Sequence, residues 1–253
     1  MRVWDVSPGY LNRGSLLGEH REIHAILSIV SNDKKGYAHH PETLRWRGHL
    51  GALGLRHNMV VSEMALRGYR HHSPVAIQDA TYWPHVYVNP PAEQFRILEK
   101  KYENREPGRI PLPQNAQQLW AQHKYSVLAR DVAHYQQIGR SLVRPASAPA
   151  FEELVHSLSE YLRKRPPQRG LINALQHMWG YVSEFAREEG LPIPQDPIAL
   201  SEIVGCLALA HNVTYLLHST ALSDLQTWAM IIDDKEPQMI DTNGKETPCP
   251  SAL

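Results

Sequence analysis

The chain has 253 residues, enough for one large domain or two small ones, and 42% of them are hydrophobic. It contains no apolar run of about 18 residues, which excludes a membrane-spanning helix, and Cys206 and Cys249 form neither a disulfide framework nor a metal motif, which favours the cytoplasm. The 26 basic and 26 acidic side chains balance, and residues 1–110 carry an excess of only four positive charges (15 minus 11), so we expect modest, salt-dependent affinity for nucleic acid.

The first predicted helix follows a short N-terminal segment. Ser7 and Pro8 suit the N-cap and the first position of a helix, so we expect a helix from Pro8 to Ser31. Glu19 and Glu22 lie one turn apart on one of its faces. The neighbouring, buried face is predicted from positions that recur at steps of three and four, which are Leu16, His20, Ile23, Leu27 and Val30.

Two histidines, His20 and His24, lie one turn apart on this helix, with Glu22 between them. Zinc proteases place the glutamate directly beside one of the two histidines, which is not the case here, and the sequence offers no clear third ligand. We therefore predict no metal site and no cofactor, and we expect both histidines to be structural. Glu22 and Arg21, at the border of the buried face, either form a structural ion pair or line a cleft.

A second long helix is predicted after a turn-rich basic segment. Pro41 suits its first position, and Gly68 suits its end. Arg45 and Arg47 lie near its start, where they either belong to a solvated first turn or bind phosphate, and the sequence does not separate these alternatives. The apolar stripe of this helix consists of Trp46, Leu50, Leu53, Val60 and Met64.

The best linker in the sequence is the Pro-rich segment 107–115, which separates a first domain, 1–106, from a second domain, 116–232. A polar C-terminal tail, 233–253, has no apolar pattern, and we expect it to be flexible. Helical patterns dominate on both sides of the linker, so the sequence predicts an all-α protein with two helical domains.

The second domain carries polar residues at helical spacing. Asn173, His177 and Tyr181 recur every fourth residue and therefore share one helix face. They either line a pocket for an anion or form a buried hydrogen-bonded stripe. The residues that would complete the pocket are Lys124, Tyr135, Arg140 and Arg169. In His123-Lys124-Tyr125, His134-Tyr135, Ile138-Gly139-Arg140 and the segment from Asn173 to Tyr181, the chain resembles the YbgA-like domain, a bacterial domain of uncertain function.

A second resemblance covers roughly residues 1–100. It is carried by Arg2, Leu11, the motif Leu16-Leu17-x-Glu19-x-Arg21-Glu22-Ile23, and then His49-Leu50, Leu53, Glu63 and Leu66-Arg67-Gly68-Tyr69. In these residues the chain resembles the pyrimidine-dimer DNA glycosylase family of phage endonuclease V and its bacterial relatives. It departs from that family at Met1, where the phage enzyme has Thr, and at Ser15 and Ala25, which replace a His and a DNA-contacting Arg.

The resemblance implies an endonuclease V-like helical fold, followed by a helical bundle, and it implies an activity. The α-amine of Met1 would attack the sugar C1′, and Glu22 would stabilise the sugar cation and assist elimination. The partner would be duplex DNA with a damaged or modified pyrimidine, and the first candidate lesion is a cyclobutane pyrimidine dimer. Arginines equivalent to Arg2 and Arg21 hold DNA in that family. We extend the predicted DNA-binding set to Arg2, Arg21, His20, His40, Arg45 and Arg47.

This chemistry needs a free terminal amine. Arg2 is too bulky for removal of Met1 to be expected, and no signal-peptide pattern is present. An α-amine titrates near about pH 8, well below lysine, and a carboxylate stabilises an oxocarbenium-like state. Two alternatives stay open: a non-catalytic nucleic-acid-binding module, or a base-processing enzyme acting on RNA or nucleotides. The glycosylase requires the Met1 amine close to Glu22, whereas a binding module does not.

Overall fold

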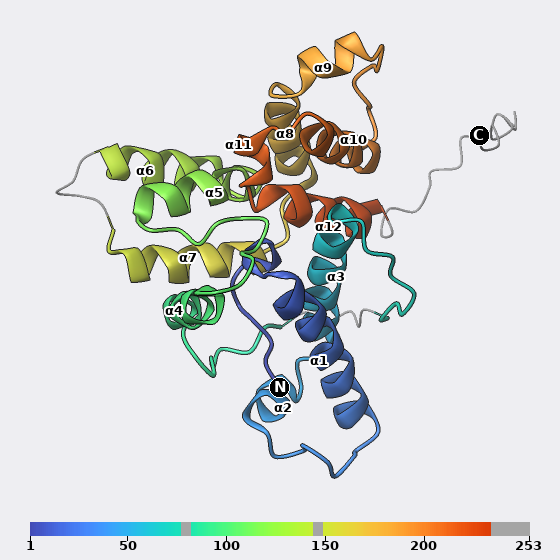
Figure 1. The fold of residues 1–253 in the computed structure, drawn as a ribbon, viewed down its shortest axis with the longest axis vertical. Helices are drawn as coiled ribbons and strands as arrows, with labels where there is room; N and C mark the ends of the chain where they lie inside the picture. Colours follow the sequence, from blue (N-terminus) through green and yellow to red (C-terminus); the bar gives the residue numbers. More distant parts are fainter. Residues whose placement is uncertain (77–81, 144–148, 234–253) are drawn as a thin grey trace, which may run out of the picture.

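A computed structural model of the chain describes residues 1–76, 82–143 and 149–233 (Figure 1). Within these ranges the regular elements are helices and no strand occurs, so the predicted all-α class is confirmed. Among the described helices, none combines the length and the apolar composition that crossing a bilayer requires. All but the first residue of the predicted tail, 233–253, lies outside the described residues.

The N-terminal region contains η1 (Pro8–Tyr10), α1 (Arg13–Ser31), α2 (Pro41–Trp46), α3 (Leu50–Leu66) and α4 (Pro91–Tyr102). Each of the two long helices predicted from the sequence is divided into two elements. The side chain of Asn12 accepts a hydrogen bond from the Ser15 N–H at 2.9 Å, so α1 starts after this N-cap and not at Pro8. Gly48, with φ at 77°, separates α2 from α3, and Gly68, with the same φ, follows the end of α3 as predicted.

The second region contains eight helices within the described residues. They are α5 (Ala116–Leu128), α6 (Val132–Val143), α7 (Phe151–Arg163), α8 (Gln168–Trp179), α9 (Ser183–Glu188), α10 (Pro197–Ala210), α11 (Thr214–Leu217) and α12 (Ala221–Asp233). In Figure 1, α1 and α2 lie at one end of the long axis and α9 at the other, with α12 crossing near one end of α3.

The hydrophobic core consists of two clusters, and each cluster contains side chains from both regions. Leu55 and Met59 of α3 belong to the cluster formed mainly by α8, α10 and α12. Leu154 and Leu158 of α7 belong to the cluster around α1, α3 and α4. Helix α12 packs on α3 and α7 packs on α4, so the two regions bury apolar surface against each other.

The Pro-rich segment 107–115 is packed against the N-terminal region and is not a free linker. Ile110 is completely buried and donates its N–H to the Gly9 carbonyl at 2.9 Å. The guanidinium of Arg109 forms an ion pair with the buried Glu63 carboxylate of α3 at 2.7 Å. The segment therefore holds the two regions together and does not let them move freely. The boundaries of two independently folding domains stay a prediction.

Candidate active site

A surface pocket lies between the N-terminal segment, α1 and α4, and it contains both predicted catalytic residues. We call it the Met1 pocket. Met1 and Glu22 line it together with Arg2, which was predicted to bind DNA. The other lining residues are Trp4, Gly14, Ser15, Gly18, Glu19, Ile97 and Lys101.

The N-terminal segment is held beside α1 by a buried carboxylate. Glu19 of α1 accepts a hydrogen bond from the Trp4 backbone N–H at 2.9 Å. The same carboxylate receives two hydrogen bonds from the Arg56 guanidinium of α3, at 2.8 and 2.9 Å. Arg56 also donates to the Val6 carbonyl at 3.0 Å. A buried carboxylate is costly unless it has such hydrogen-bond partners. The hydrogen bonds of Glu19 therefore fix the start of the chain against α1.

The face of α1 that lines the pocket is made of small residues followed by an acid. Gly14, Gly18 and Glu22 recur every fourth residue and therefore share one helix face. A Cβ atom added at Gly18 would meet nothing within 4 Å, so the space beside Gly18 is open. This spacing of glycines is visible in the sequence, but it was not among the predicted features of the site.

The charges of the Met1 pocket are mostly unpaired. Glu22 is half-buried, and its carboxylate has no hydrogen bond or ion pair within the described part of the chain. The Arg2 guanidinium lies 4.9 Å from the centre of the Trp4 ring. Burial, and then the charges of Arg105 and Arg2, lower the pKa of Lys101. Lys101 is a second amine in the pocket that the sequence analysis missed, and a lowered pKa favours its nucleophilic form.

The other predicted DNA-binding residues lie outside this pocket. Arg21 is exposed on α1, where its Nε donates to the Leu17 carbonyl at 3.1 Å. Arg47 is exposed at the end of α2. His40 caps α2, because its Nδ1 accepts a hydrogen bond from the Glu42 N–H at 3.2 Å. Arg21 and Arg47 remain accessible to phosphate, whereas one nitrogen of His40 is engaged in the cap.

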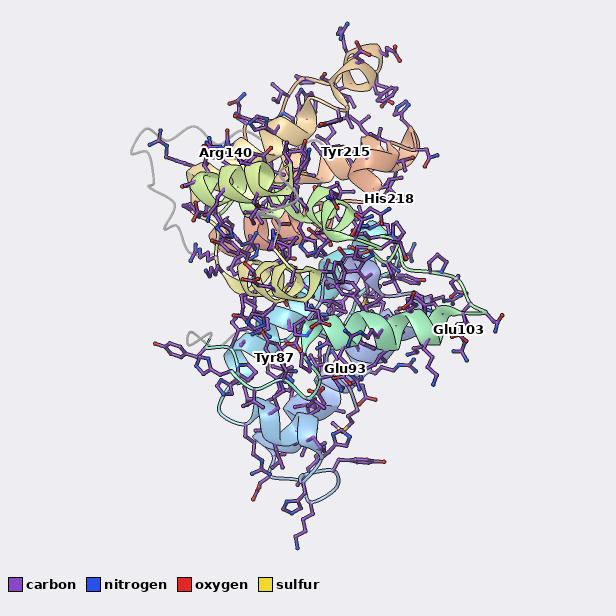
Figure 2. All side chains as sticks on the ribbon, turned by 90° about the vertical axis from the view of Figure 1, so that its left-hand side faces the viewer. Tyr87, Glu93, Glu103, Arg140, Tyr215 and His218 are labelled. Atoms are coloured by element: carbon purple, nitrogen blue, oxygen red, sulfur yellow. The ribbon has the colours of Figure 1, made fainter. Side chains whose placement is uncertain are left out.

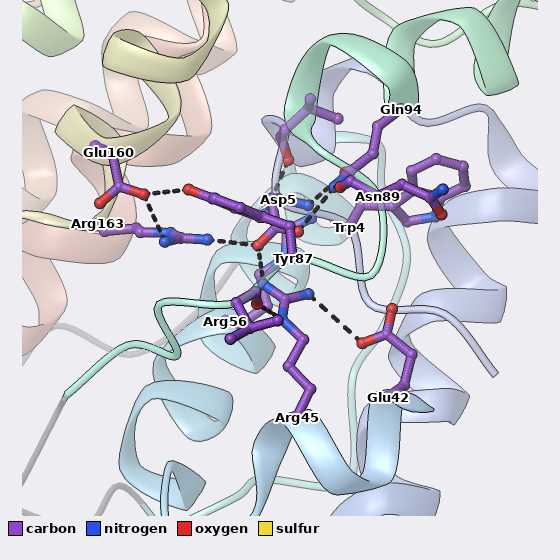
Figure 3. A network of polar contacts seen from close by, with 12 residues as sticks. Trp4, Asp5, Glu42, Arg45, Arg56, Tyr87, Asn89, Gln94, Glu160 and Arg163 are labelled. Carbon is purple, nitrogen blue, oxygen red and sulfur yellow. Dashed lines mark hydrogen bonds and ion pairs between the residues drawn. The ribbon is translucent and has the colours of Figure 1, made fainter. Parts of the chain in front are cut away.

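Arg45 is buried, and this corrects both alternatives given for it. It is 8% exposed, and its guanidinium contacts the carboxylates of Asp5 and Glu42 (Figure 3). Asp5 also binds Arg163 of α7 at 2.5 Å and the Gln94 side chain of α4 at 2.8 Å. Arg45 therefore belongs to neither a solvated turn nor a phosphate site. We call this group the Asp5 network, and its members are Asp5, Glu42, Arg45, Tyr87, Gln94, Glu160 and Arg163.

His20 and His24 are joined by two further histidines, His57 of α3 and His71 beyond α3, and we call this group the His cluster. The prediction of no metal site depended on the lack of a third ligand, and that premise was wrong. Burial, followed by the neighbouring histidines, lowers the pKa of His20 to about 4, and burial lowers that of His57 to about 4. His20 faces this cluster, and its Nε2 is buried, so its predicted contact with DNA has no support here.

The residues predicted to form a pocket in the second region are divided between two places. Tyr135, Asn173 and His177 line one pocket together with Arg169. The same pocket is also lined by Arg130, whose guanidinium is paired with Asp224 at 2.8 Å. The four predicted side chains therefore lie together around one pocket between α6 and α8, and a role in binding an anion stays a prediction.

Lys124, Tyr181 and Arg140 lie elsewhere. The Lys124 ammonium is 5.0 Å from the Tyr125 ring and 4.8 Å from the Tyr215 ring, and Tyr181 stacks on Tyr215 with 4.8 Å between ring centres. Arg140 is on α6, where it bonds to a neighbouring glutamine, and Figure 2 shows it apart from Tyr215. The prediction that Asn173, His177 and Tyr181 share one helix face was wrong for Tyr181, because α8 ends at Trp179 and Gly180 is its C-cap.

The Met1 pocket thus contains a carboxylate, the terminal amine and a second amine, all carried by a helical framework. Residues 1–76 match the family model described as pyrimidine dimer DNA glycosylase, and residues 124–190 match the model described as protein of unknown function (DUF1722). The predicted fusion of a glycosylase-like domain to a second domain of uncertain function is thus confirmed. Searches of curated proteins and of solved structures found no match. The first match contains Met1 and Glu22 but not Lys101.

Proposed function

We propose that this protein is a bifunctional DNA glycosylase and abasic-site lyase that acts on damaged or modified pyrimidines in duplex DNA. The observation that carries the proposal is that Met1 and Glu22 line one pocket with Arg2. The match of residues 1–76 to the pyrimidine dimer DNA glycosylase model supports the same substrate class. A cyclobutane pyrimidine dimer is the first substrate to test.

The proposed reaction begins with attack of the Met1 amine on the sugar C1′. The bond from C1′ to the base breaks, the base leaves with a proton, and the carboxylate of Glu22 stabilises the oxocarbenium-like charge that develops. The C1′–O4′ bond then breaks and the sugar ring opens, so that O4′ takes up a proton and stays on C4′ as a hydroxyl, while the amine nitrogen gives up a proton and forms an imine with C1′. The imine acidifies C2′, Glu22 takes a C2′ proton, and the C3′–O bond breaks with release of the 3′ phosphate. Water then hydrolyses the imine and frees the amine.

The cations of the pocket have a separate role in this proposal. Arg2 lies in the pocket, and Arg21 is exposed one residue before Glu22 on α1. Their guanidinium groups would bind phosphates on either side of the reacting sugar and fix its position, without contributing to sequence recognition. Binding through so few cations gives modest affinity and a strong dependence on salt.

The experiment compares Glu22→Gln with the wild type under single-turnover conditions. Substrates are a duplex with one cyclobutane dimer, a duplex with one abasic site, and their undamaged counterpart. Gln keeps the shape of the side chain but removes its charge, so we expect both cleavage rates to fall by about 10²- to 10³-fold with little change in DNA affinity. The control is Glu188→Gln, which removes an exposed carboxylate from α9 at the far end of the molecule.

Three results would contradict the proposal. Unchanged cleavage by Glu22→Gln would make Glu22 a structural residue. Binding of damaged duplex without cleavage by the wild type would support the non-catalytic nucleic-acid-binding module. Activity on RNA or free nucleotides, with none on either damaged duplex, would support the base-processing enzyme.

A further inference from the structure

The His cluster lies outside the Met1 pocket and takes no part in the proposed reaction. One ring nitrogen from each of His20, His24, His57 and His71 lies within 4.8 Å of one from every other member. Ring centres are 4.7 Å apart for His20 and His24, 4.8 Å for His24 and His57, and 5.0 Å for His57 and His71. The four side chains converge on one point.

Three separate segments supply these side chains. Helix α1 presents His20 and His24 one turn apart on one face, and the adjacent helix α3 presents His57. His71 follows three residues after Gly68, whose positive φ turns the chain away from α3. Residues from an i, i+4 pair, a facing helix and a following segment form the kind of donor set that surrounds a tetrahedral ion.

Hydrogen bonding fixes which nitrogen of His57 points into the cluster. Its Nδ1 lies 3.2 Å from the Oδ1 of Asn58, and an amide oxygen can only accept, so Nδ1 carries the proton. The Nε2 of His57 therefore presents a lone pair, and it lies 3.2 Å from the Nε2 of His24. Nitrogens bound to one tetrahedral zinc at about 2.0–2.1 Å lie roughly 3.3–3.4 Å apart, so this spacing already matches the edge of such a site. Asn58 acts as the outer partner that orients a metal-binding imidazole.

The cluster also contains a polar atom without a partner. The Nε2 of His20 is buried and has no hydrogen bond within the described residues. His57 is fully buried, and the Ser73 hydroxyl lies 3.3 Å from the Nε2 atoms of His24 and His71. A buried, unpaired nitrogen costs free energy, and a bound cation would remove that cost.

We propose that the His cluster is a structural binding site for one divalent transition-metal ion, with zinc as the expected ion. Imidazole nitrogen suits zinc, copper, nickel and iron, and four protein ligands leave no open position for a substrate. The ion ties the segment that follows α3 to α1 and α3, and so holds α1 in place from the side opposite its small-residue face. This inference does not depend on the proposed function.

The experiment uses the full chain after removal of metal by a chelator. Zinc titration followed by calorimetry should show one equivalent per chain, and zinc should raise the thermal midpoint in a concentration-dependent way. Cobalt(II) should give the intense visible absorption of a tetrahedral ion. In His71→Ala and in His24→Ala, zinc affinity should fall by about 100-fold or more, and the cobalt band should be lost.

The matched control is His72→Ala, which removes an exposed imidazole from the next residue. It should bind zinc as tightly as the wild type. Absence of a one-equivalent zinc site in the wild type, an octahedral cobalt spectrum, or equal affinity loss in the His71 and His72 variants would overturn the proposal. Circular dichroism of the metal-free variants shows whether each of them folds. If His71→Ala does not fold, His24→Ala provides the same test.

Discussion

The Asp5 network and the Met1 pocket both surround the N-terminal segment, and they differ in how their charges are satisfied. In the network, Asp5 is 6% exposed and is shared by two arginines and an amide (Figure 3). In the pocket, Glu22 is half-buried and unpaired within the described residues. Paired, buried charges of the first kind fix a structure, whereas an unpaired acid in a pocket that two amines also line is available to a substrate.

This difference shows why residue type alone misassigns cations. Arg45 and Arg21 were both predicted to contact DNA, yet one is enclosed by carboxylates and the other is exposed. The two arginines differ only in the side chains that surround them in the folded structure.

The largest expected effect is on cleavage of DNA and concerns the Met1 pocket. A peptide tag left in place ahead of Met1 converts its amine to an amide, which neither attacks C1′ nor forms an imine. We expect abasic-site cleavage to be lost completely, measured by gel assay with the N-terminus verified by intact mass. The control is the same tag placed after Leu253, which should leave cleavage unchanged when circular dichroism shows equal folding. Full activity of the N-terminally tagged protein would show that another group is the nucleophile.

In the Asp5 network, the substitution Asp5→Asn should destabilise the protein strongly. The substitution leaves Arg45 and Arg163 buried with no carboxylate between them, and losing one partner of a buried ion pair costs about 3–5 kcal/mol. Urea unfolding measures this loss. The control is Glu152→Gln, which breaks an exposed pair with Arg96 and should cost less than about 1 kcal/mol. Equal, small effects in both variants would mean that the Asp5 network contributes little to stability.

A buried histidine at the junction of the two regions should make stability depend on pH. Burial, followed by the charge of Arg130, lowers the pKa of His123 from 6.5 to about 3, and its Nε2 contacts the Tyr10 hydroxyl at 2.9 Å. Below pH 6.5 the His123 side chain binds a proton in the unfolded chain but not in the folded chain. The contribution of this group to the free energy of unfolding is therefore fully present above pH 6.5 and falls as the pH drops toward 3. Between pH 7 and 5 the loss from this group is about 2 kcal/mol.

The variant that tests this is His123→Gln, which cannot take up a proton. Its free energy of unfolding should change less between pH 7 and 5 than that of the wild type, whatever its absolute stability. His39→Gln, which removes an exposed histidine, should keep the full dependence. The same pH dependence in all three proteins would show that His123 is protonated in the folded state.

The smallest effect concerns DNA affinity. Arg21→Ala and Arg2→Ala should each weaken binding and reduce the slope of log affinity against log salt by about one unit per lost phosphate contact. Titrations at several salt concentrations measure the slope. Arg187→Ala, an exposed arginine on α9 at the other end of the molecule, should leave it unchanged. An unaltered slope in Arg21→Ala would assign Arg21 to the helix surface.

The sequence predicted those features that local spacing controls. The sequence placed a helix over Leu16 to Val30 and a helix end at Gly68. It predicted the buried face of α1 only in part, because Leu16 and Ile23 are buried but His20, Leu27 and Val30 are partly exposed. The other buried side chains include Glu19, Ile26 and Ile29.

The sequence could not show that Asp5 meets Arg163, because 158 residues separate them and α7 must first dock. The His cluster was missed for the same reason, since His57 and His71 join His20 and His24 only after α1 and α3 pack. Arg45 was misassigned because burial depends on these distant partners.

The central claim is that the terminal amine in the Met1 pocket is the nucleophile. Borohydride reduction in the presence of an abasic-site duplex traps an imine as a stable amine, and mass mapping of the adduct identifies the residue. We expect one adduct per chain on the Met1 α-amine, and we expect no adduct when Met1 carries a tag. An adduct on Lys101 or another lysine, or no adduct under conditions in which a known lyase is trapped, would contradict it.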